Sequence, residues 1–459
     1  MSDEICFLSL SEASRAVQSK RLSPVDLVNA ILQRIERHNP ALAAFILVRA
    51  GDVLSEAKRA EAEIQRGLWK GPLHGIPFAV KDIVDTAGVR TTGNSALFAD
   101  RIPSGSADVW HRLSEAGALL LGKTGTWEFA LGGTAYDLPW PPARNPWDLS
   151  RDTGGSSSGS AVALASGLTY GAIGTDTSGS IRIPAAWCGV AGLKPTFGLL
   201  PVHGIMPLSF TCDHAGPMAR TSEDCALLMD IMAHSGGKRS APNASGVGRF
   251  SSSIGQSLKG LRVGLLPQFA DDHPIDPLVA QAVNTARDIL ASAGAEIVEA
   301  QIKPLRHYDD VCNLIARAES YSIHQHYLRT SPQLYGSQSR PRLFAGGLVA
   351  AGDYLNAQRE RSELIRDMQE VMRDVDLLLS PIIADTAPIH GGATTYSAYF
   401  TRPFSVTGFP AHTARVGFTD KGLPLAVQIV ARPFEDHLAL RAGDIVEKQD
   451  RWRRHPTLQ

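Results

Sequence analysis

The sequence lacks any excess of one charge. Its 459 residues contain 45 Lys and Arg against 46 Asp and Glu, a net charge of −1. No overall positive field therefore exists to attract nucleic acid or an anionic membrane. Hydrophobic residues make up 44% and charged residues 20% of the chain, which excludes wholesale disorder and a coiled coil. The composition predicts a globular protein with no nucleic-acid partner.

Long hydrophobic runs are also absent. The longest informative uncharged run covers residues 153–175, and 14 of its 23 residues are Gly, Ser or Thr, which makes a poor membrane span. The first ten residues, MSDEICFLSL, carry two acids and no apolar core of secretory length. We therefore expect a soluble, cytoplasmic protein with no membrane partner.

Cysteine is scarce, and histidine forms no metal-binding pattern. The five cysteines are an odd number, and no C-x-x-C occurs, which argues against a disulfide scaffold and a thiolate zinc site. There is no H-E-x-x-H motif, and His324 and His326 have no obvious cluster of further ligands. The sequence predicts reduced cysteines, structural or surface histidines, no metal and no cofactor.

The N-terminal part, residues 1–70, is predicted to be helical. Ser23 followed by Pro24 is typical of a helix start, and apolar residues then recur with helical spacing until Pro40 ends the pattern. A more polar helix is expected over 52–66. We expect these helices to cover a sheet.

Residues 71–220 consist of short apolar segments separated by Gly, Ser, Thr and Pro. Such segments, alternating with helical patterns, predict an α/β fold with a largely buried sheet. Strands are expected at 76–80, 118–121, 172–174 and 190–193, and helices at 107–116 and 161–167.

The C-terminal part continues this alternation after a Ser- and Gly-rich segment, 235–257, that is predicted as a loop. No repeat at a solenoid period occurs, so one elaborated α/β domain over 1–459 is expected, with residues 258–459 completing the sheet and the substrate pocket. Strands are expected at 261–266, 377–379, 413–416 and 425–430, and helices at 277–294 and 353–374.

The first of three segments that can support chemistry is residues 75–82, GIPFAVKD, in which Lys81 ends an apolar, strand-like run. A lysine at the end of a strand commonly reaches solvent. A desolvated lysine instead has a lowered pKa and can act as a base near neutral pH. Alternation along the strand would place Asp82 on the opposite side from Lys81.

The second segment is residues 154–160, GGSSSGS. A flexible linker is one interpretation, weakened because the segment leads directly into an apolar helical run. A phosphate-binding loop is another, but the Gly-Lys-Ser/Thr ending of a Walker loop is missing. The third is a serine held in strained backbone that only glycine neighbours permit.

The third segment is residues 174–184, GTDTSGSIRIP. A turn of small residues can point consecutive N–H groups into one cavity that stabilises an oxyanion, with Ser180 as nucleophile. The same residues could also form only a tight turn. No G-x-S-x-G elbow surrounds Ser180, which disfavours an α/β-hydrolase, whereas a Ser-His-Asp triad stays open because its members need not be adjacent.

Together and in this order, the three segments resemble the amidase signature family. That family's lysine follows G-I-P-x-x-x-K-D, its bridging serine follows the paired glycines of G-G-S-S-x-G-S, and its nucleophile lies in D-T-x-G-S-I-R-x-P. The matching residues are Lys81, Ser156 and Ser180, and the spacing of 24 residues between the two serines is specific. The likeness extends over nearly the whole chain, although Ser178 stands where glycine is commoner.

The resemblance implies a fold and a set of site residues. The fold is a large mixed twisted β-sheet covered on both faces by α-helices. The catalytic group is a Ser–cis-Ser–Lys triad, with a cis peptide between Gly155 and Ser156. It implies catalytic Lys81, Ser156 and Ser180, oxyanion donors at Thr177, Ser178 and Gly179, and supporting roles for Ser157, Asp176 and Arg182.

The implied activity is hydrolysis of a small-molecule carboxylic amide, through a seryl acyl-enzyme, to a carboxylate and ammonia or an amine. No cofactor is implied, and dimers are usual in the family. The alternative is the A subunit of an aspartyl/glutamyl-tRNA amidotransferase, but Ile183 stands where glutamine is expected in that protein, and 207–209 (PLS) look more like free amidases. A non-catalytic binding protein on the same fold is the third interpretation. Trp127, Tyr136, Trp140 and Arg402 are candidate pocket residues, with packing as the alternative for each.

Overall fold

The computed structural model describes residues 2–233, 250–390, 398–449 and 454–458. Eleven strands form one sheet in the order β1-β3-β2-β4-β6-β5-β10-β11-β9-β7-β8. Parallel pairs (β2 with β3 and β4, β7 with β8 and β9) and antiparallel pairs occur together, so the sheet is mixed. The strands are β1 (Phe45–Val48), β2 (Pro77–Lys81), β3 (Leu119–Thr124), β4 (Gly171–Asp176), β5 (Ala191–Lys194), β6 (His214–Ala219), β7 (Arg262–Leu265), β8 (Glu296–Glu299), β9 (Leu377–Pro381), β10 (Ala411–Phe418) and β11 (Pro424–Ala431).

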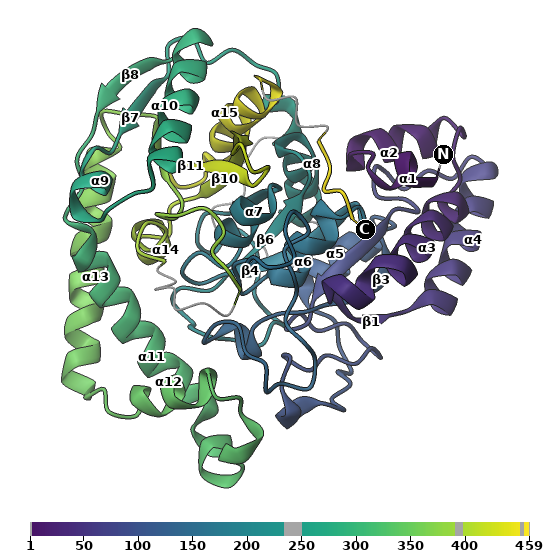
Figure 1. Ribbon diagram of the computed structural model, residues 1–459, viewed down its shortest axis with the longest axis horizontal. Coiled ribbons are helices and arrows are strands. Elements are labelled where there is room, and N and C mark those ends of the chain that lie inside the picture. Colours follow the sequence, from purple (N-terminus) through teal and green to yellow (C-terminus); the bar gives the residue numbers. More distant parts are fainter. Residues whose placement is uncertain (1, 234–249, 391–397, 450–453, 459) are drawn as a thin grey trace.

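Helices precede, connect and follow these strands (Figure 1). They are α1 (Ser2–Cys6), α2 (Leu10–Gln18), α3 (Pro24–Leu42), α4 (Ala50–Gln65), α5 (Asp108–Glu115), α6 (Ser158–Ala165), α7 (Arg182–Cys188), α8 (Ser222–Met232), α9 (Gln268–Asp272), α10 (Pro277–Ser292), α11 (Leu305–Thr330), α12 (Ser339–Gly346), α13 (Ala351–Val371), α14 (Arg402–Val406) and α15 (Asp436–Gln449). Among the described residues, no helix combines the length and the apolar composition needed to cross a bilayer.

Helices cover both faces of the sheet, as predicted. Successive side chains of a strand point to opposite faces. On β9, Leu377 and Leu379 join a buried cluster with side chains of α10 and α15, whereas Leu378 joins a cluster with side chains of α11 and α13. Both faces of this strand are therefore buried under helices, which is the layered arrangement expected of an α/β protein.

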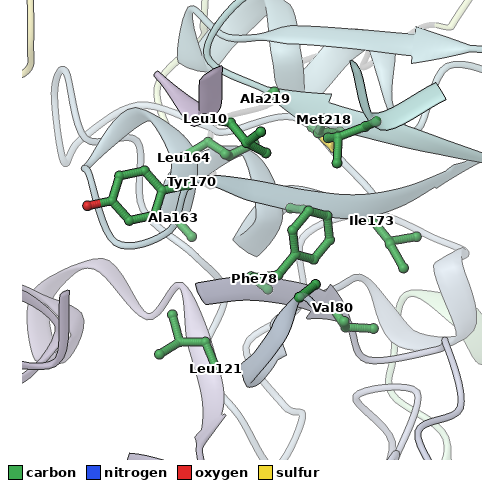
Figure 2. Close-up of a cluster of buried hydrophobic side chains, with 14 of the residues drawn as sticks. Leu10, Phe78, Val80, Leu121, Ala163, Leu164, Tyr170, Ile173, Met218 and Ala219 are labelled. Atoms are coloured by element: carbon green, nitrogen blue, oxygen red, sulfur yellow. The ribbon is translucent and has the colours of Figure 1, made fainter. Parts of the chain in front are cut away.

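An apolar core surrounds the middle of β2 (Figure 2). Phe78 and Val80 of β2, Ile173 of β4, Leu164 of α6 and Met218 of β6 are all 0% exposed. Burying a side chain of this size stabilises the fold by about 1.5–3 kcal/mol relative to leaving it exposed. Because this core continues to the end of β2, the last residue of that strand is also buried and shielded from water.

The start of α3 follows the sequence prediction, but its end does not. Ser23 Oγ accepts from Asp26 N, the Asp26 carboxylate accepts from Ser23 N, and Pro24 occupies the first turn. The helix does not end before Pro40 as predicted. It continues to Leu42 and stops where Ala43 takes a left-handed conformation with φ of 48°. A proline in the last turn removes only its own N–H bond, a small loss compared with a proline in the helix interior.

All eight predicted strands exist, with bounds shifted by a few residues, but three strands were not predicted. β1 lies inside the N-terminal part expected to be helical, and it pairs with β3 at the sheet edge. β6 contains Gly and Pro, and β8 has only four residues, so neither shows a clear apolar pattern. Of the predicted loop 235–257, residues 235–249 lie outside the described residues, and Ser251–Ser253 form a short 3-10 helix.

Candidate active site

The three polar segments of the sequence meet at one edge of the sheet. β2 and β4 are parallel neighbours, so their carboxyl ends lie side by side. Lys81 is the last residue of β2, Ser180 lies in the turn between β4 and α7, and Ser156 precedes α6. Ser157 N donates to Ser180 O over 3.1 Å, which joins the two serine segments directly.

Lys81 is fully buried, and its side-chain nitrogen lies among hydroxyl groups. Its Nζ is 2.7 Å from Ser156 Oγ, 2.9 Å from Ser157 Oγ and 2.8 Å from Thr175 Oγ1. A hydroxyl can donate as well as accept, so this set of partners suits either protonation state of the amine. The contact with Ser156 is the arrangement expected of a base and the group that it deprotonates.

Burial lowers the pKa of Lys81 from 10.5 to about 7, against the opposing charges of Asp176 and Asp213. Asp82 turns to the other side, as predicted. Its carboxylate accepts from Thr92 N over 3.0 Å and also bonds the Thr92 hydroxyl. A substantial fraction of Lys81 is therefore neutral near neutral pH, and only the neutral amine has a lone pair with which to accept a proton.

The peptide bond between Gly155 and Ser156 is cis, which confirms that prediction. Gly155 lies against the ring of Trp127, and a Cβ at this position would collide with the indole. Trp127 N also lies 3.4 Å from Ser156 O. Trp127, which the sequence offered as a candidate pocket residue, is thus in contact with the segment that carries Ser156.

Asp176 and Arg182 form a buried ion pair that holds the turn around Ser180. Arg182 Nη2 lies 2.9 Å and Nε 3.0 Å from the two carboxylate oxygens, and both side chains are 0% exposed. The carboxylate also accepts from Gly179 N over 2.7 Å and from Ile181 N over 3.1 Å. Burial by itself would raise the pKa of Asp176, but the Arg182 charge holds it well below its usual range.

The turn itself places glycine where the backbone requires it. Gly179 has φ of 133°, whereas Ser178, which replaces the commoner glycine, does not have a positive φ. A Cβ on Gly179 would collide with Thr401, whose hydroxyl bonds Ser178 O. Because Gly179 N–H is already bonded to Asp176, the predicted oxyanion donors are not equivalent. The amide hydrogens of Thr177 and Ser178 are the ones not committed to that carboxylate.

Three other candidate pocket residues have partners outside the groups described above. Tyr136 is 59% exposed and contacts the His390 ring, and Trp140 lies under the Arg90 guanidinium at 5.1 Å. Arg402 is paired with Asp309. Of the two histidines considered as metal ligands in the sequence, His324 is buried, and its Nδ1 lies 2.9 Å from Tyr335 Oη. Among the residues described, no group of three or more His, Cys, Asp or Glu side chains is placed to hold a metal ion.

Sequence reasoning missed two residues that the structure brings to the site. Thr175 is the third hydroxyl partner of Lys81. Asp213 accepts from Thr177 Oγ1 over 2.6 Å, and burial raises its pKa to about 6. Thr175 and Thr177 flank Asp176 in the third segment, and Asp213 immediately precedes β6. The strand pairing of β4 with β6 brings Asp213 there, so only the unpredicted strand could have indicated it.

Comparison with known proteins gives consistent matches over nearly the full chain. A family model described as Amidase matches residues 26–440. An amidase of Pseudomonas putida is 37% identical over 467 residues, covering 98% of each chain. The A subunit of a glutamyl-tRNA(Gln) amidotransferase from Carboxydothermus hydrogenoformans is 34% identical over 475 residues, covering 97% of this chain and 98% of the relative. A crystal structure of an amidase superposes with a TM-score of 0.86 at 32% identity, covering 96% of this chain and all of the other.

Proposed function

The chain belongs to the amidase signature family of amide-hydrolysing enzymes, and on that premise we propose that it is a free-standing amidase with a Ser180–Ser156–Lys81 triad. The observation that carries this proposal is the contact of 2.7 Å between the fully buried Lys81 Nζ and Ser156 Oγ. A lysine with a pKa lowered to about 7 can serve as the base of such a triad.

In the proposed reaction, protons move along the three residues in sequence. Neutral Lys81 takes the proton of Ser156, and Ser156 takes that of Ser180 as Ser180 Oγ attacks the amide carbonyl carbon. The tetrahedral intermediate collapses when the C–N bond breaks, Ser156 gives a proton to the departing nitrogen and Lys81 returns its proton to Ser156, leaving the acyl-enzyme, an amine and a neutral Lys81. Water then attacks the ester through the same relay, releasing the carboxylate and restoring Ser180.

We place the oxyanion of this intermediate at the amide hydrogens of Thr177 and Ser178. Gly179 N–H is engaged by Asp176, so we assign Gly179 the role of shaping the turn. Asp176 and Arg182 hold that turn before substrate arrives, and donors fixed in advance need no reorganisation during the reaction. Ser157 and Thr175 keep the Lys81 nitrogen in place.

A second candidate function is the A subunit of an aspartyl/glutamyl-tRNA amidotransferase. The 34% identity to a protein of that kind supports it. Ile183 in place of the expected glutamine, and the higher identity to the Pseudomonas putida amidase, support the free-standing enzyme instead. A non-catalytic binding protein is disfavoured because Lys81, Ser156 and Ser180 are all retained.

The deciding experiment is a hydrolysis profile across primary amides of aliphatic, aryl and peptidyl acids, with glutamine included, for the purified chain alone. We expect turnover of at least one small amide and labelling of Ser180 by a fluorophosphonate. Turnover of glutamine only in the presence of a co-purifying tRNA-binding protein would establish the second candidate. Absence of both turnover and labelling would leave the binding protein.

We also propose that the enzyme is a homodimer in the cytoplasm. The family resemblance supports the dimer, and five buried cysteines without disulfides suit a reducing compartment. Light scattering on the purified protein tests the dimer, since a single species of 49.2 kDa would contradict it.

A further inference from the structure

A cavity of about 130 Å³ begins beside Thr175 and Thr177 at the end of β4. Its other walls are mostly hydrocarbon, and they come mainly from the segment between β5 and β6, with Ile83 and Ala130 on the opposite side. This segment supplies Ile205, Met206 and Leu208. No step of the proposed reaction uses the cavity itself, although Thr175 in its wall contacts Lys81 and Thr177 in its wall carries one of the proposed oxyanion donors.

The cavity adjoins the proposed triad through Thr175, whose hydroxyl contacts Lys81 Nζ. Thr175 Oγ1 and Ser156 Oγ are each within 2.8 Å of the same atom, Lys81 Nζ. Ser156 is the group that protonates the departing nitrogen, so that nitrogen must be near Ser156 when the C–N bond breaks. Because Thr175 and Ser156 contact the same nitrogen, Thr175 is the part of the cavity wall that the structure connects to the departing group in the proposed reaction.

We propose that this cavity receives an apolar substituent of the leaving amine, so that the preferred substrates are secondary amides, R–CO–NH–R′, with R′ a compact hydrocarbon group. The proposal rests on the proposed function, and it adds the substrate class. A primary amide releases ammonia, which needs no more room than a water molecule, about 30 Å³.

The polar side-chain atoms in the wall are already paired, which is why the cavity suits hydrocarbon. The Asp213 carboxylate accepts from Thr177 Oγ1 (2.6 Å), Leu208 N (2.8 Å) and Ser209 N (3.0 Å). His214 bonds carbonyl oxygens through Nδ1, and its Nε2 lies 3.2 Å from Lys194 Nζ. A polar substituent would lose its water without gaining a partner, whereas a hydrocarbon substituent gains from burial.

The size and the opening of the cavity agree with this occupant. An apolar cavity of about 150 Å³ is known to hold a benzene molecule, so about 130 Å³ fits a phenyl ring or a branched alkyl group. Phe210 and Val202 line the cavity and are 57% and 40% exposed, so it reaches the surface beside them. The same opening gives the released amine a route to solvent.

The test compares a primary amide with the N-benzyl amide of the same acid, and the acid is one whose primary amide is cleaved in the hydrolysis profile. If no primary amide is cleaved, the N-benzyl amides of the same three acid classes are assayed instead. Wild type should have the higher kcat/KM for the N-benzyl amide. Met206→Trp fills the cavity and should lower the ratio of N-benzyl to primary amide kcat/KM about 30-fold, within the range that one pocket contact can discriminate. Leu348→Trp, at a site 87% exposed and away from the cavity, is the control and should leave the ratio as it is.

A second variant and a second readout keep the outcomes distinct. Phe210→Ala removes an exposed side chain with little risk to folding, and it should lower the same ratio about fivefold through lost apolar contact. Benzylamine should also capture the acyl-enzyme better than hydroxylamine in wild type, and less well in Met206→Trp. The proposal would be overturned if Met206→Trp and Phe210→Ala both leave the ratio of N-benzyl to primary amide kcat/KM unchanged, or if that ratio depends on the acyl group instead of the amine. The amidase function would stand in either case. Cleavage of no amide at all would mean that the proposed function itself fails.

Discussion

Two fully buried lysines end adjacent parallel strands, and their surroundings differ in one respect. Lys81 closes β2, and Lys123 lies one residue from the end of β3, opposite Val80 in the register of the two strands. The nitrogen of Lys81 contacts three hydroxyls, whereas that of Lys123 contacts the Val84 carbonyl oxygen and two threonine hydroxyls. Burial lowers the pKa of Lys81 to about 7 and that of Lys123 to about 8.

We infer from the comparison that burial alone does not make a lysine a catalytic base. A carbonyl oxygen can only accept a hydrogen bond, so at Lys123 it favours the ammonium form. Aspartate charges favour the ammonium form at both lysines, so they do not distinguish the two. Hydroxyls can donate to a neutral amine, and one of those at Lys81 belongs to the serine that follows the cis bond. The proposed roles are therefore a base at Lys81 and a structural cation at Lys123.

The largest loss of activity should follow replacement of Ser180, the nucleophile of the proposed triad. Ser180→Ala removes the nucleophile, and we expect kcat to fall about 10⁴-fold or more, as for other serine nucleophiles. The fold should persist, because the side chain fills little space. Mass spectrometry after fluorophosphonate treatment is the check: wild type should carry one adduct on Ser180, and an adduct on a different residue would remove the assignment.

The next largest effect should follow replacement of Lys81 itself. Lys81→Met should lower kcat about 10³-fold, because the relay loses its base, a group that contributes about 10²–10⁴-fold in general. Lys81→Arg should not rescue the loss, since a guanidinium stays protonated throughout the accessible pH range. Near-normal turnover by Lys81→Arg in a steady-state assay would contradict the role.

A smaller effect is expected from the ion pair that holds the turn. Asp176→Asn keeps the shape of the side chain. It removes the negative charge that faces Arg182, and it replaces one of the two oxygens that accept from Gly179 N and Ile181 N. We expect kcat to fall about 10²-fold, comparable to the loss of one oxyanion donor, with a smaller change in KM. Steady-state kinetics at a fixed pH measure both kcat and KM. A rise in KM with kcat unchanged would show that the pair serves substrate binding instead.

The smallest effect on catalysis should come from the second lysine. Lys123→Met leaves Val84 O and Thr91 Oγ1 without their donor, which should lower the free energy of unfolding by about 1–3 kcal/mol. The midpoint of the rate–pH profile should stay where it is in wild type. Urea denaturation and the pH profile together test this, and a shifted midpoint with unchanged stability would reverse the roles of the two lysines.

The sequence was sufficient for the parts of the site that lie within one motif. Lys81 at the end of an apolar strand follows from residues close together in the chain, whereas the cis bond before Ser156 and the supporting roles of Asp176 and Arg182 follow from the family resemblance of two short motifs. Eight of the strands were predicted for the same reason, because an apolar run between turn residues marks a strand locally.

Features that depend on distant pairing could not be predicted. Asp213 reaches Thr177 only because β6 pairs with β4, and β6 itself, with Gly and Pro inside, has no strand pattern. β1 was missed because four residues at an edge, between two helices, carry little signal. The engagement of Gly179 N–H by Asp176 is a matter of side-chain geometry, which spacing does not specify.

The most direct test of the central claim is the pH dependence of the rate at which a fluorophosphonate modifies Ser180, measured in a single turnover so that product release does not contribute. Lys81 must be neutral to act, and its pKa is lowered to about 7, so the rate should rise with pH through the neutral range and level off above it. The Lys123→Met variant should give the same midpoint, and Lys81→Met should give a low rate without this rise. A wild-type rate that is flat from acid to alkaline pH would contradict Lys81 as the base.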